Sequence, residues 1–152
     1  MLGYFFGKGK ELDFEVETKN LKDGRGESEY LVDLCWWKEQ DGRYWLELVL
    51  ESEWQPSKGE IEQDFYKLVD VKARLKVWVC CWGERQMQAC QPSLSQAVSK
   101  ARFKFPEEEY LIINLPYSEK PEYTDCVVVE GFWMNWQGQQ SPLRPFRIHR
   151  HG

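Results

Sequence analysis

Three carboxylates in the first half of the chain have the types and the spacing of a metal-dependent catalytic site. Asp33 lies within one predicted strand, and Glu51 and Glu53 end the next strand. Residues i and i+2 of a strand share a face about 6.6 Å apart, and neighbouring strands lie about 4.8 Å apart. Three carboxylates on one face are therefore within reach of one Mg²⁺ or Mn²⁺ ion, which suits hard oxygen ligands. Such an ion polarises a phosphate and lowers the pKa of a bound water.

The register of the hairpin between the two strands decides whether these carboxylates meet. If Asp41 and Gly42 form a two-residue turn, Asp33 faces Leu50, and Glu51 points to the opposite side of the sheet. If the loop has three residues, or a β-bulge intervenes, Asp33 pairs with position 49 or 51, and the acids share a face. The sequence leaves both registers open.

A helix fits the residues that follow, from Glu60 to Ala73. At about 100° per residue, Ile61, Phe65 and Leu68 fall on one stripe, and Lys72 falls on the same stripe. A lysine on a buried stripe costs free energy unless it snorkels to solvent or finds an anionic partner. Lys72 is therefore a candidate for an inward-facing cation near the carboxylates.

The hydrophobic pattern along the whole chain predicts an α+β fold with a mixed, mostly antiparallel sheet and two helices. Alternating or continuous apolar runs indicate strands, and the apolar stripe indicates the first helix. The second helix is expected to have Ser93 as its N-cap. The predicted strands cover about residues 12–17, 30–37, 44–53, 75–82, 109–115 and 124–136, and the predicted helices cover 60–73 and 93–102.

Length and composition indicate one globular domain over residues 1–152, with 42% hydrophobic and 30% charged residues. No apolar run approaches the roughly 20 residues of a membrane span, and the first residues are too short and glycine-broken for a signal peptide. Five cysteines without a Cys-x-x-Cys pair indicate buried thiols in a reducing cytoplasm. The two histidines, His149 and His151, lie at the C-terminus, which argues against a zinc site.

The net charge of −5 argues against a protein that coats nucleic acid through bulk charge. It leaves room for a nuclease, because a carboxylate metal site is itself acidic and basic residues can be clustered locally. Lys72, Arg74 and Lys76 form one such cluster, and the chain between Arg144 and His151 forms another. The alternative interpretation of both clusters is a solvated face and a C-terminal tail.

Taken together, the carboxylates and the helix resemble the core of the restriction-endonuclease-like (PD-(D/E)XK) superfamily over about residues 11–82. The resemblance rests on Asp33, on Glu51-Ser52-Glu53, and on an amphipathic helix with Asp64, Phe65, Lys67 and Lys72. It implies a core of three strands, a helix and a further strand, and cleavage of DNA or RNA with Mg²⁺ or Mn²⁺. The first helix of the family core has no evident counterpart here.

The resemblance also implies a role for each residue. Asp33 and Glu51 hold the metal with help from the Ser52 carbonyl, and Glu53 takes the place usually held by a catalytic lysine. Lys72 or Lys67, from the helix, then neutralises the charge that develops on the phosphorane.

Three other interpretations remain open. Glu47, Glu51 and Glu53 could be a solvated stripe at an ordinary strand end. Alternatively, the chain is a non-catalytic binding module or a homodimer, in which a second chain replaces the missing first helix. Exposed aromatic residues would then form a peptide, base or sugar platform. The candidates for that platform are Trp36, Trp37, Trp45, Trp54, Phe132, Trp133 and Trp136.

The sequence contains no motif that is typical of the other common enzyme classes. The chain has no Gly-x-Ser-x-Gly, no phosphate-binding glycine-rich loop and no dinucleotide fingerprint.

Overall fold

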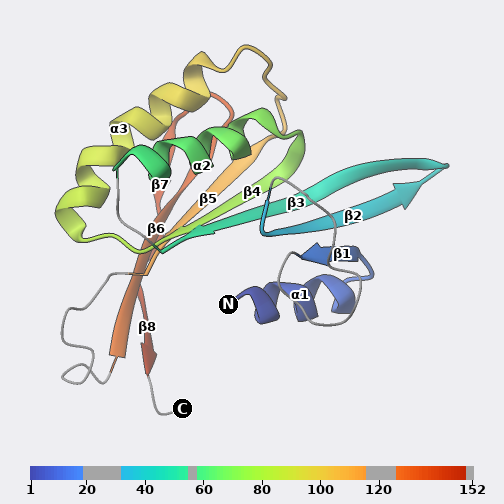
Figure 1. Ribbon diagram of the computed structural model, residues 1–152, viewed down its shortest axis with the longest axis horizontal. Coiled ribbons are helices and arrows are strands. Elements are labelled where there is room, and N and C mark those ends of the chain that lie inside the picture. The colour runs from blue at the N-terminus through green and yellow to red at the C-terminus, as the bar shows by residue number, and fades with distance from the viewer. Residues whose placement is uncertain (19–31, 55–57, 116–125, 150–152) are drawn as a thin grey trace.

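The computed structural model describes residues 1–18, 32–54, 58–115 and 126–149 (Figure 1). Within these ranges the chain forms three helices and eight strands. In chain order they are α1 (Leu2–Glu11), β1 (Glu15–Thr18), β2 (Leu34–Gln40), β3 (Arg43–Glu53), α2 (Lys58–Asp70), β4 (Ala73–Cys80), α3 (Glu84–Lys100), β5 (Glu109–Asn114), β6 (Cys126–Asn135), β7 (Gln140–Pro142) and β8 (Phe146–His149).

The strands form one open, mixed sheet in the order β1-β2-β3-β4-β5-β6-β7, and β8 pairs with β6. The β3–β4 and β4–β5 pairs are parallel, because α2 and α3 serve as the crossover connections between them. The other pairs are antiparallel. The expected α+β class with a mixed, mostly antiparallel sheet is therefore confirmed, but the described chain has three helices rather than two.

The additional helix is α1, in a region where the alternating pattern predicts only a strand from residue 12. Leu12 caps the helix and is half-exposed, and Asp13 turns the chain with a φ of 63° before the short strand β1 begins. Three glycines in a ten-residue helix hide its periodicity. The helix is stabilised by packing instead: Phe5 and Phe6 contact the sheet, and a Cβ on Gly9 would lie 2.5 Å from Val16.

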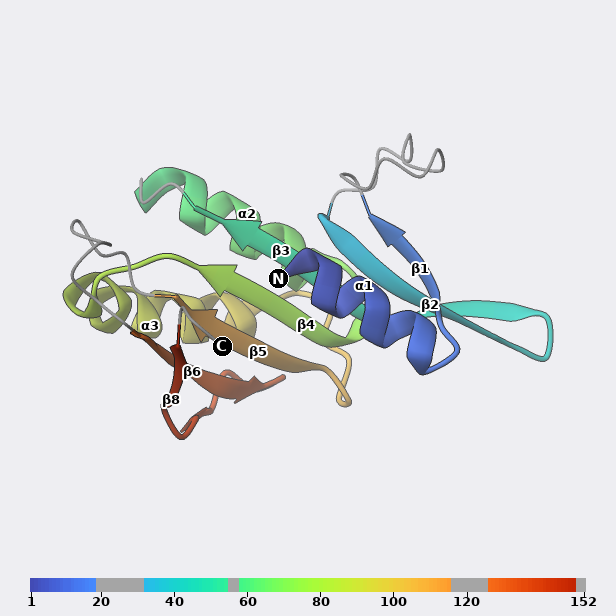
Figure 2. The same ribbon diagram turned by 90° about the horizontal axis from the view of Figure 1, so that it is seen from below.

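Helices cover both faces of the sheet. Figure 2 shows α1 on the opposite side of the sheet from α2 and α3. Helix α1 belongs to the same chain as the sheet that it covers. None of the helices in the described residues is long and apolar enough to cross a membrane.

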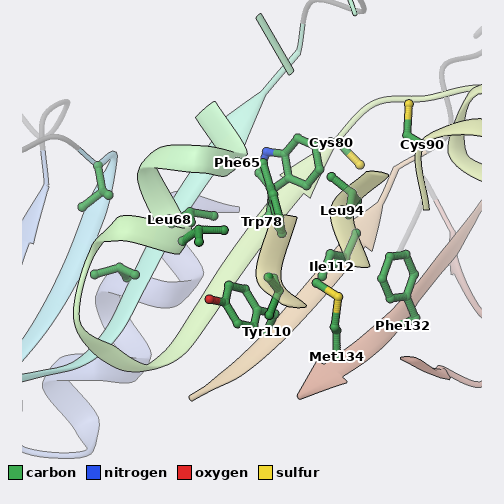
Figure 3. Close-up of a cluster of buried hydrophobic side chains, with 14 of the residues drawn as sticks. Phe65, Leu68, Trp78, Cys80, Cys90, Leu94, Tyr110, Ile112, Phe132 and Met134 are labelled. Atoms are coloured by element: carbon green, nitrogen blue, oxygen red, sulfur yellow. The ribbon is translucent and has the colours of Figure 1, made fainter. Parts of the chain in front are cut away.

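The larger core lies between the sheet and the two crossover helices (Figure 3). Phe65 of α2 packs on Trp78 of β4 with ring centroids 5.1 Å apart, and Trp82 meets Trp78 edge-on at 4.9 Å. Cys35, Cys80 and Cys90 are buried, as expected. The smaller core, beneath α1, contains Leu34, Trp36, Leu48, Leu50, Val77 and Val79.

Helix α3 begins at Glu84 rather than at the predicted Ser93, because its N-cap is Gly83 and Pro92 lies inside it. A proline in a helix interior removes a hydrogen bond and costs about 3 kcal/mol, so Pro92 is an expected boundary. The helix continues through it because a buried stripe holds it on the sheet. That stripe is formed by Met87, Cys90, Leu94 and Val98.

Candidate functional site

The hairpin that positions the predicted carboxylates has a two-residue turn. Asp41 and Gly42 have φ values of 55° and 70°, and Gln40 pairs with Arg43 across the turn. Positive φ at both central positions is the geometry that favours Asp-Gly in tight hairpins. With this turn alone, Asp33 would face Leu50 rather than Glu51.

A β-bulge further along the hairpin changes that register. Trp36 pairs with Leu48, whereas Trp37 pairs with Leu46, so Glu47 is an extra residue on β3. A bulge of this kind shifts all subsequent pairs by one position. Beyond the bulge Asp33 therefore comes beside Glu51, and both residues lie on the face covered by α2.

Asp33 and Glu51 are joined by one hydrogen bond, and Asp33 makes further hydrogen bonds to the neighbours of Glu51. The Asp33 N–H donates to Glu51 Oε2 at 2.8 Å and to the Leu50 carbonyl at 3.0 Å. In return, Asp33 Oδ2 accepts hydrogen bonds from Ser52 N at 2.9 Å and from Ser52 Oγ at 2.7 Å. Glu51 is only 5% exposed, and Asp33 is partly buried. These burials contradict the interpretation of Glu51 as part of a solvated stripe.

Lys67 of α2 supplies a cation to this pair. Its Nζ lies 3.7 Å from Glu51 Oε1 and makes a close contact with Asp64 Oδ1 on its own helix. The hydrogen bond to Asp64 is the main cause that raises the pKa of Lys67, and the charge of Glu51 adds to it. Lys67 is therefore positively charged at neutral pH, and 41% of its side chain is open to solvent.

Lys72 does not reach this cluster. Helix α2 ends at Asp70, so Lys72 lies beyond the helix and is exposed instead of lying on its inward stripe. Its neighbour Ala73 pairs with Leu46 of β3, five residues before Glu51, which is about 16 Å along the strand. The expectation that Lys72 shares the carboxylate pocket is therefore wrong, because the predicted helix was too long.

Glu53 lies next to the cluster. It is partly buried at the end of β3, in register with Cys80 of β4. By strand alternation it faces the same side as Glu51, about 6.6 Å away.

The described carboxylates form no complete set of protein ligands for a metal ion. Among the described residues, no group of three or more His, Cys, Asp or Glu side chains is arranged to hold a metal ion. The Glu51 carboxylate accepts the backbone N–H of Asp33, and both Ser52 donors bind the Oδ2 atom of the Asp33 carboxylate. Mg²⁺ is typically held by one or two carboxylates together with waters and substrate phosphates.

A second charged cluster, around Lys76, was missed in the sequence. Lys76 is fully buried, and its Nζ donates to the Val69 carbonyl at 3.1 Å, to Tyr110 Oη at 3.1 Å and to Glu108 Oε2 at 3.0 Å. Burial lowers the pKa of Lys76. It was assigned to a basic surface cluster, yet it lies in a strand that the apolar pattern predicts to be covered on both faces. That position was the signal for a buried, paired lysine.

The aromatic residues do not form one platform in the described structure. Trp36 and Phe132 are buried in the two cores, whereas Trp54 and Trp133 are 54% and 36% exposed. Successive residues of a strand point to opposite faces, so adjacent aromatic pairs are split between the two sides of the sheet.

Comparison with known proteins gives no family for the chain. No family model matches it, and no curated protein matches it. Among solved structures, it is similar to a CN-hydrolase superfamily protein from Xanthomonas campestris, which was crystallised with an arsenic adduct in its active site. The match has a TM-score of 0.40 and 11% identity, and covers 89% of this chain and 48% of that chain. The chain thus spans about half the length of that protein.

These comparisons contradict the resemblance to the restriction-endonuclease-like superfamily, because the matching structure belongs to a different superfamily and no family model supports the assignment. The motif behind that resemblance is short, and its lysine position is occupied by Glu53. At this TM-score the CN-hydrolase likeness supports no statement about activity. The function must therefore be argued from the cluster around Asp33, Glu51 and Lys67.

Proposed function

We propose that the chain is a phosphodiesterase that cleaves DNA or RNA with Mg²⁺ or Mn²⁺ held by Asp33 and Glu51. The observation that carries the proposal is the bulge-set register, which joins Asp33 to Glu51, together with the Lys67 ammonium 3.7 Å from Glu51. Carboxylates that bind a divalent cation and a lysine that binds a phosphate are complementary parts of phosphodiester chemistry.

The Asp33 and Glu51 carboxylates bind the ion, and Ser52 holds Asp33 in place through two hydrogen bonds. When bound, the ion polarises the phosphate and lowers the pKa of a water. Glu53, on the same face, accepts the proton of the attacking water. A carboxylate in this position acts as a general base once substrate brings the water within hydrogen-bond reach.

Lys67 binds the non-bridging oxygens of the scissile phosphate. Its raised pKa excludes it as a base at neutral pH and keeps it available as a cation. Its side chain is 41% exposed, so its ammonium is able to meet a phosphate that approaches from solvent. Preorganised cations that face a developing negative charge are worth about 10²–10³-fold in rate.

The test is cleavage of supercoiled plasmid DNA and of single-stranded DNA and RNA with Mg²⁺ or Mn²⁺. We expect Glu51→Gln and Lys67→Met each to lower the cleavage rate at least about 100-fold. Lys10→Met is the matched control, since Lys10 is exposed on α1 at the other face, and it should cleave as the wild type does. Equal rates in wild type and Glu51→Gln would contradict the proposed role of Glu51. No cleavage of any of these substrates would also contradict the proposal.

A further inference from the structure

The segment between α3 and β5 is basic, aromatic and exposed. Lys100 ends α3, and in the segment after it Arg102 and Lys104 alternate with Phe103 and Phe105; all five are exposed. Phe103 is 75% exposed and Phe105 is 48% exposed. The Arg102 guanidinium lies 5.5 Å from the centre of the Phe103 ring. Two large apolar rings held in solvent between cations are an unusual surface, which indicates a binding site.

This segment borders a groove that adds a third aromatic residue. The groove has a volume of about 420 Å³, and its lining includes Phe105, Trp45, Leu46, Lys72 and Arg74. A volume in this range is enough for a flat ring system with its substituents. The groove lies beyond the end of α2, so Lys72, which does not reach the carboxylates, belongs here.

The same β-bulge that pairs Asp33 with Glu51 also shapes the groove. The extra residue, Glu47, lines it and accepts a hydrogen bond from Trp45 Nε1 at 2.9 Å. A second oxygen of Glu47 lies 3.7 Å from the Arg74 guanidinium. Bulges often re-aim side chains in this way. Glu47, the bulged residue, therefore contacts both the Trp45 ring nitrogen and the Arg74 guanidinium.

The charge of this surface is opposite to that of the whole chain. The segment and the groove together carry the cations Lys72, Arg74, Lys100, Arg102 and Lys104, against the carboxylates Glu47 and Glu107. The chain as a whole has a net charge of −5. A local basic patch on an acidic protein directs a polyanion to one place.

We propose that this surface, formed by the Lys100–Phe105 segment and the groove at Trp45, binds single-stranded nucleic acid. Bases stack on Phe103, Phe105 and Trp45, and phosphates contact the surrounding cations. Unpaired bases are required, because the faces of paired bases are hidden in the duplex stack. The inference rests on the proposed function in one respect: it names the substrate class of the carboxylate site, which lies about 16 Å farther along β3.

Basic segments with exposed phenylalanines also bind anionic membranes. The groove favours nucleic acid instead, because Trp45 is partly buried and tied to Glu47 rather than projecting from the surface. A recessed ring with an adjacent guanidinium fits a base and its phosphate, whereas a bilayer contacts only side chains that protrude.

The test is binding of fluorescently labelled oligothymidylate and oligouridylate, measured by anisotropy in the presence of EDTA. We expect Phe103→Ala/Phe105→Ala to weaken binding at least about tenfold, as loss of one stacked base does. Arg102→Gln/Lys104→Gln should weaken binding and reduce its dependence on salt. Tyr44→Ala is the matched control: Tyr44 is a 60% exposed aromatic residue at the hairpin, and its removal should leave affinity unchanged.

Equal affinity in the wild type and the double phenylalanine variant would overturn the proposal. Stronger binding to duplex DNA than to the single strand would also overturn it. So would binding to phosphatidylserine vesicles without binding to oligonucleotides. Because EDTA removes divalent cations, Glu51→Gln should bind as the wild type does. Binding without cleavage would therefore contradict the proposed function and leave this inference standing.

Discussion

Two lysine–glutamate pairs lie on the same face of the sheet, and they differ in access to solvent. Lys76 is fully buried, 3.0 Å from a Glu108 carboxylate that is itself nearly buried. Lys67 is 41% exposed, 3.7 Å from the buried Glu51. Both pairs have a buried glutamate, but only the Lys67–Glu51 pair has a lysine that is in contact with solvent.

The surroundings of the two lysines explain this difference. The three protons of the Lys76 ammonium meet three acceptors, one each from α2, β5 and the segment before β5. Such a cluster is satisfied and closed, and it ties the end of α2 to the sheet. Lys67 instead makes a close contact with Asp64 and a longer one, of 3.7 Å, with Glu51, and its side chain stays 41% exposed. We infer that the closed cluster is structural and that the open cluster is the functional one.

The largest effect is expected from breaking the closed cluster. Lys76→Met leaves the Glu108 charge buried without its partner, which should lower the free energy of unfolding by about 3–5 kcal/mol. Urea unfolding followed by tryptophan fluorescence measures it. Adding Glu108→Leu removes the stranded charge, so the double variant should recover most of the loss. A single variant as stable as the wild type would show that the pair is not buried as described.

Asp33→Ala should have the next largest effect. Ser52 N–H and Oγ both lose their acceptor, which should lower the free energy of unfolding by about 1–3 kcal/mol. Asp33→Asn keeps an oxygen acceptor and is the control, with a smaller loss in the same urea titration. Equal losses in both variants would mean that the hydrogen bonds to Ser52 do not hold the strand end.

Lys67→Met should change stability least, although it abolishes most cleavage under the proposed function. A partly exposed ion pair contributes only about 0–1 kcal/mol. Comparing unfolding free energies of the Lys67→Met and Lys76→Met variants sharpens the contrast directly. A loss at Lys67 as large as that at Lys76 would show that the open cluster is also structural.

The two lysines should also titrate in a fixed order without any substitution. Burial lowers the pKa of Lys76, whereas the hydrogen bond to Asp64 raises the pKa of Lys67. Nitrogen NMR of the lysine side chains should therefore show Lys76 losing its proton at a lower pH. Loss of the Lys67 proton first would reverse the assignment of the two environments.

The same two pKa shifts make the free energy of unfolding depend on pH in the alkaline range. Between the lowered pKa of Lys76 and the ordinary value of 10.5, the unfolded chain holds more protons, so the contribution of Lys76 rises with pH. The contribution of Lys67 is fully present below 10.5 and is lost as pH rises through its raised pKa. Substituting each lysine should remove its own part of this dependence.

The elements around the open cluster were predictable because they depend on local pattern. Strand β3 and the apolar stripe of α2 through Phe65 and Leu68 follow directly from hydrophobic periodicity. Elements that tertiary packing overrides were not predictable, as with the glycine-rich α1 and the passage of α3 through Pro92. Ile61, also assigned to that stripe, lies among the residues whose side chains are not described.

The site itself depends on one feature that local pattern does not reveal. Asp41-Gly42 predicts the turn correctly, but nothing in the residues near Glu47 marks it as the extra residue of a bulge. The bulge is a feature of the pairing between β2 and β3, and the β3–β4 register runs past it without a shift. Both the carboxylate pairing and the Trp45 groove follow from it.

Manganese binding, followed by the electron paramagnetic resonance of the unbound ion, tests the central claim that the open cluster holds a divalent cation. The account predicts that wild type and Lys76→Met/Glu108→Leu bind one ion equally well. Asp33→Ala and Glu51→Gln should each bind at least about tenfold more weakly, since loss of one ligand costs on the order of 1.4 kcal/mol or more. Equal binding by wild type, Asp33→Ala and Glu51→Gln would contradict the account.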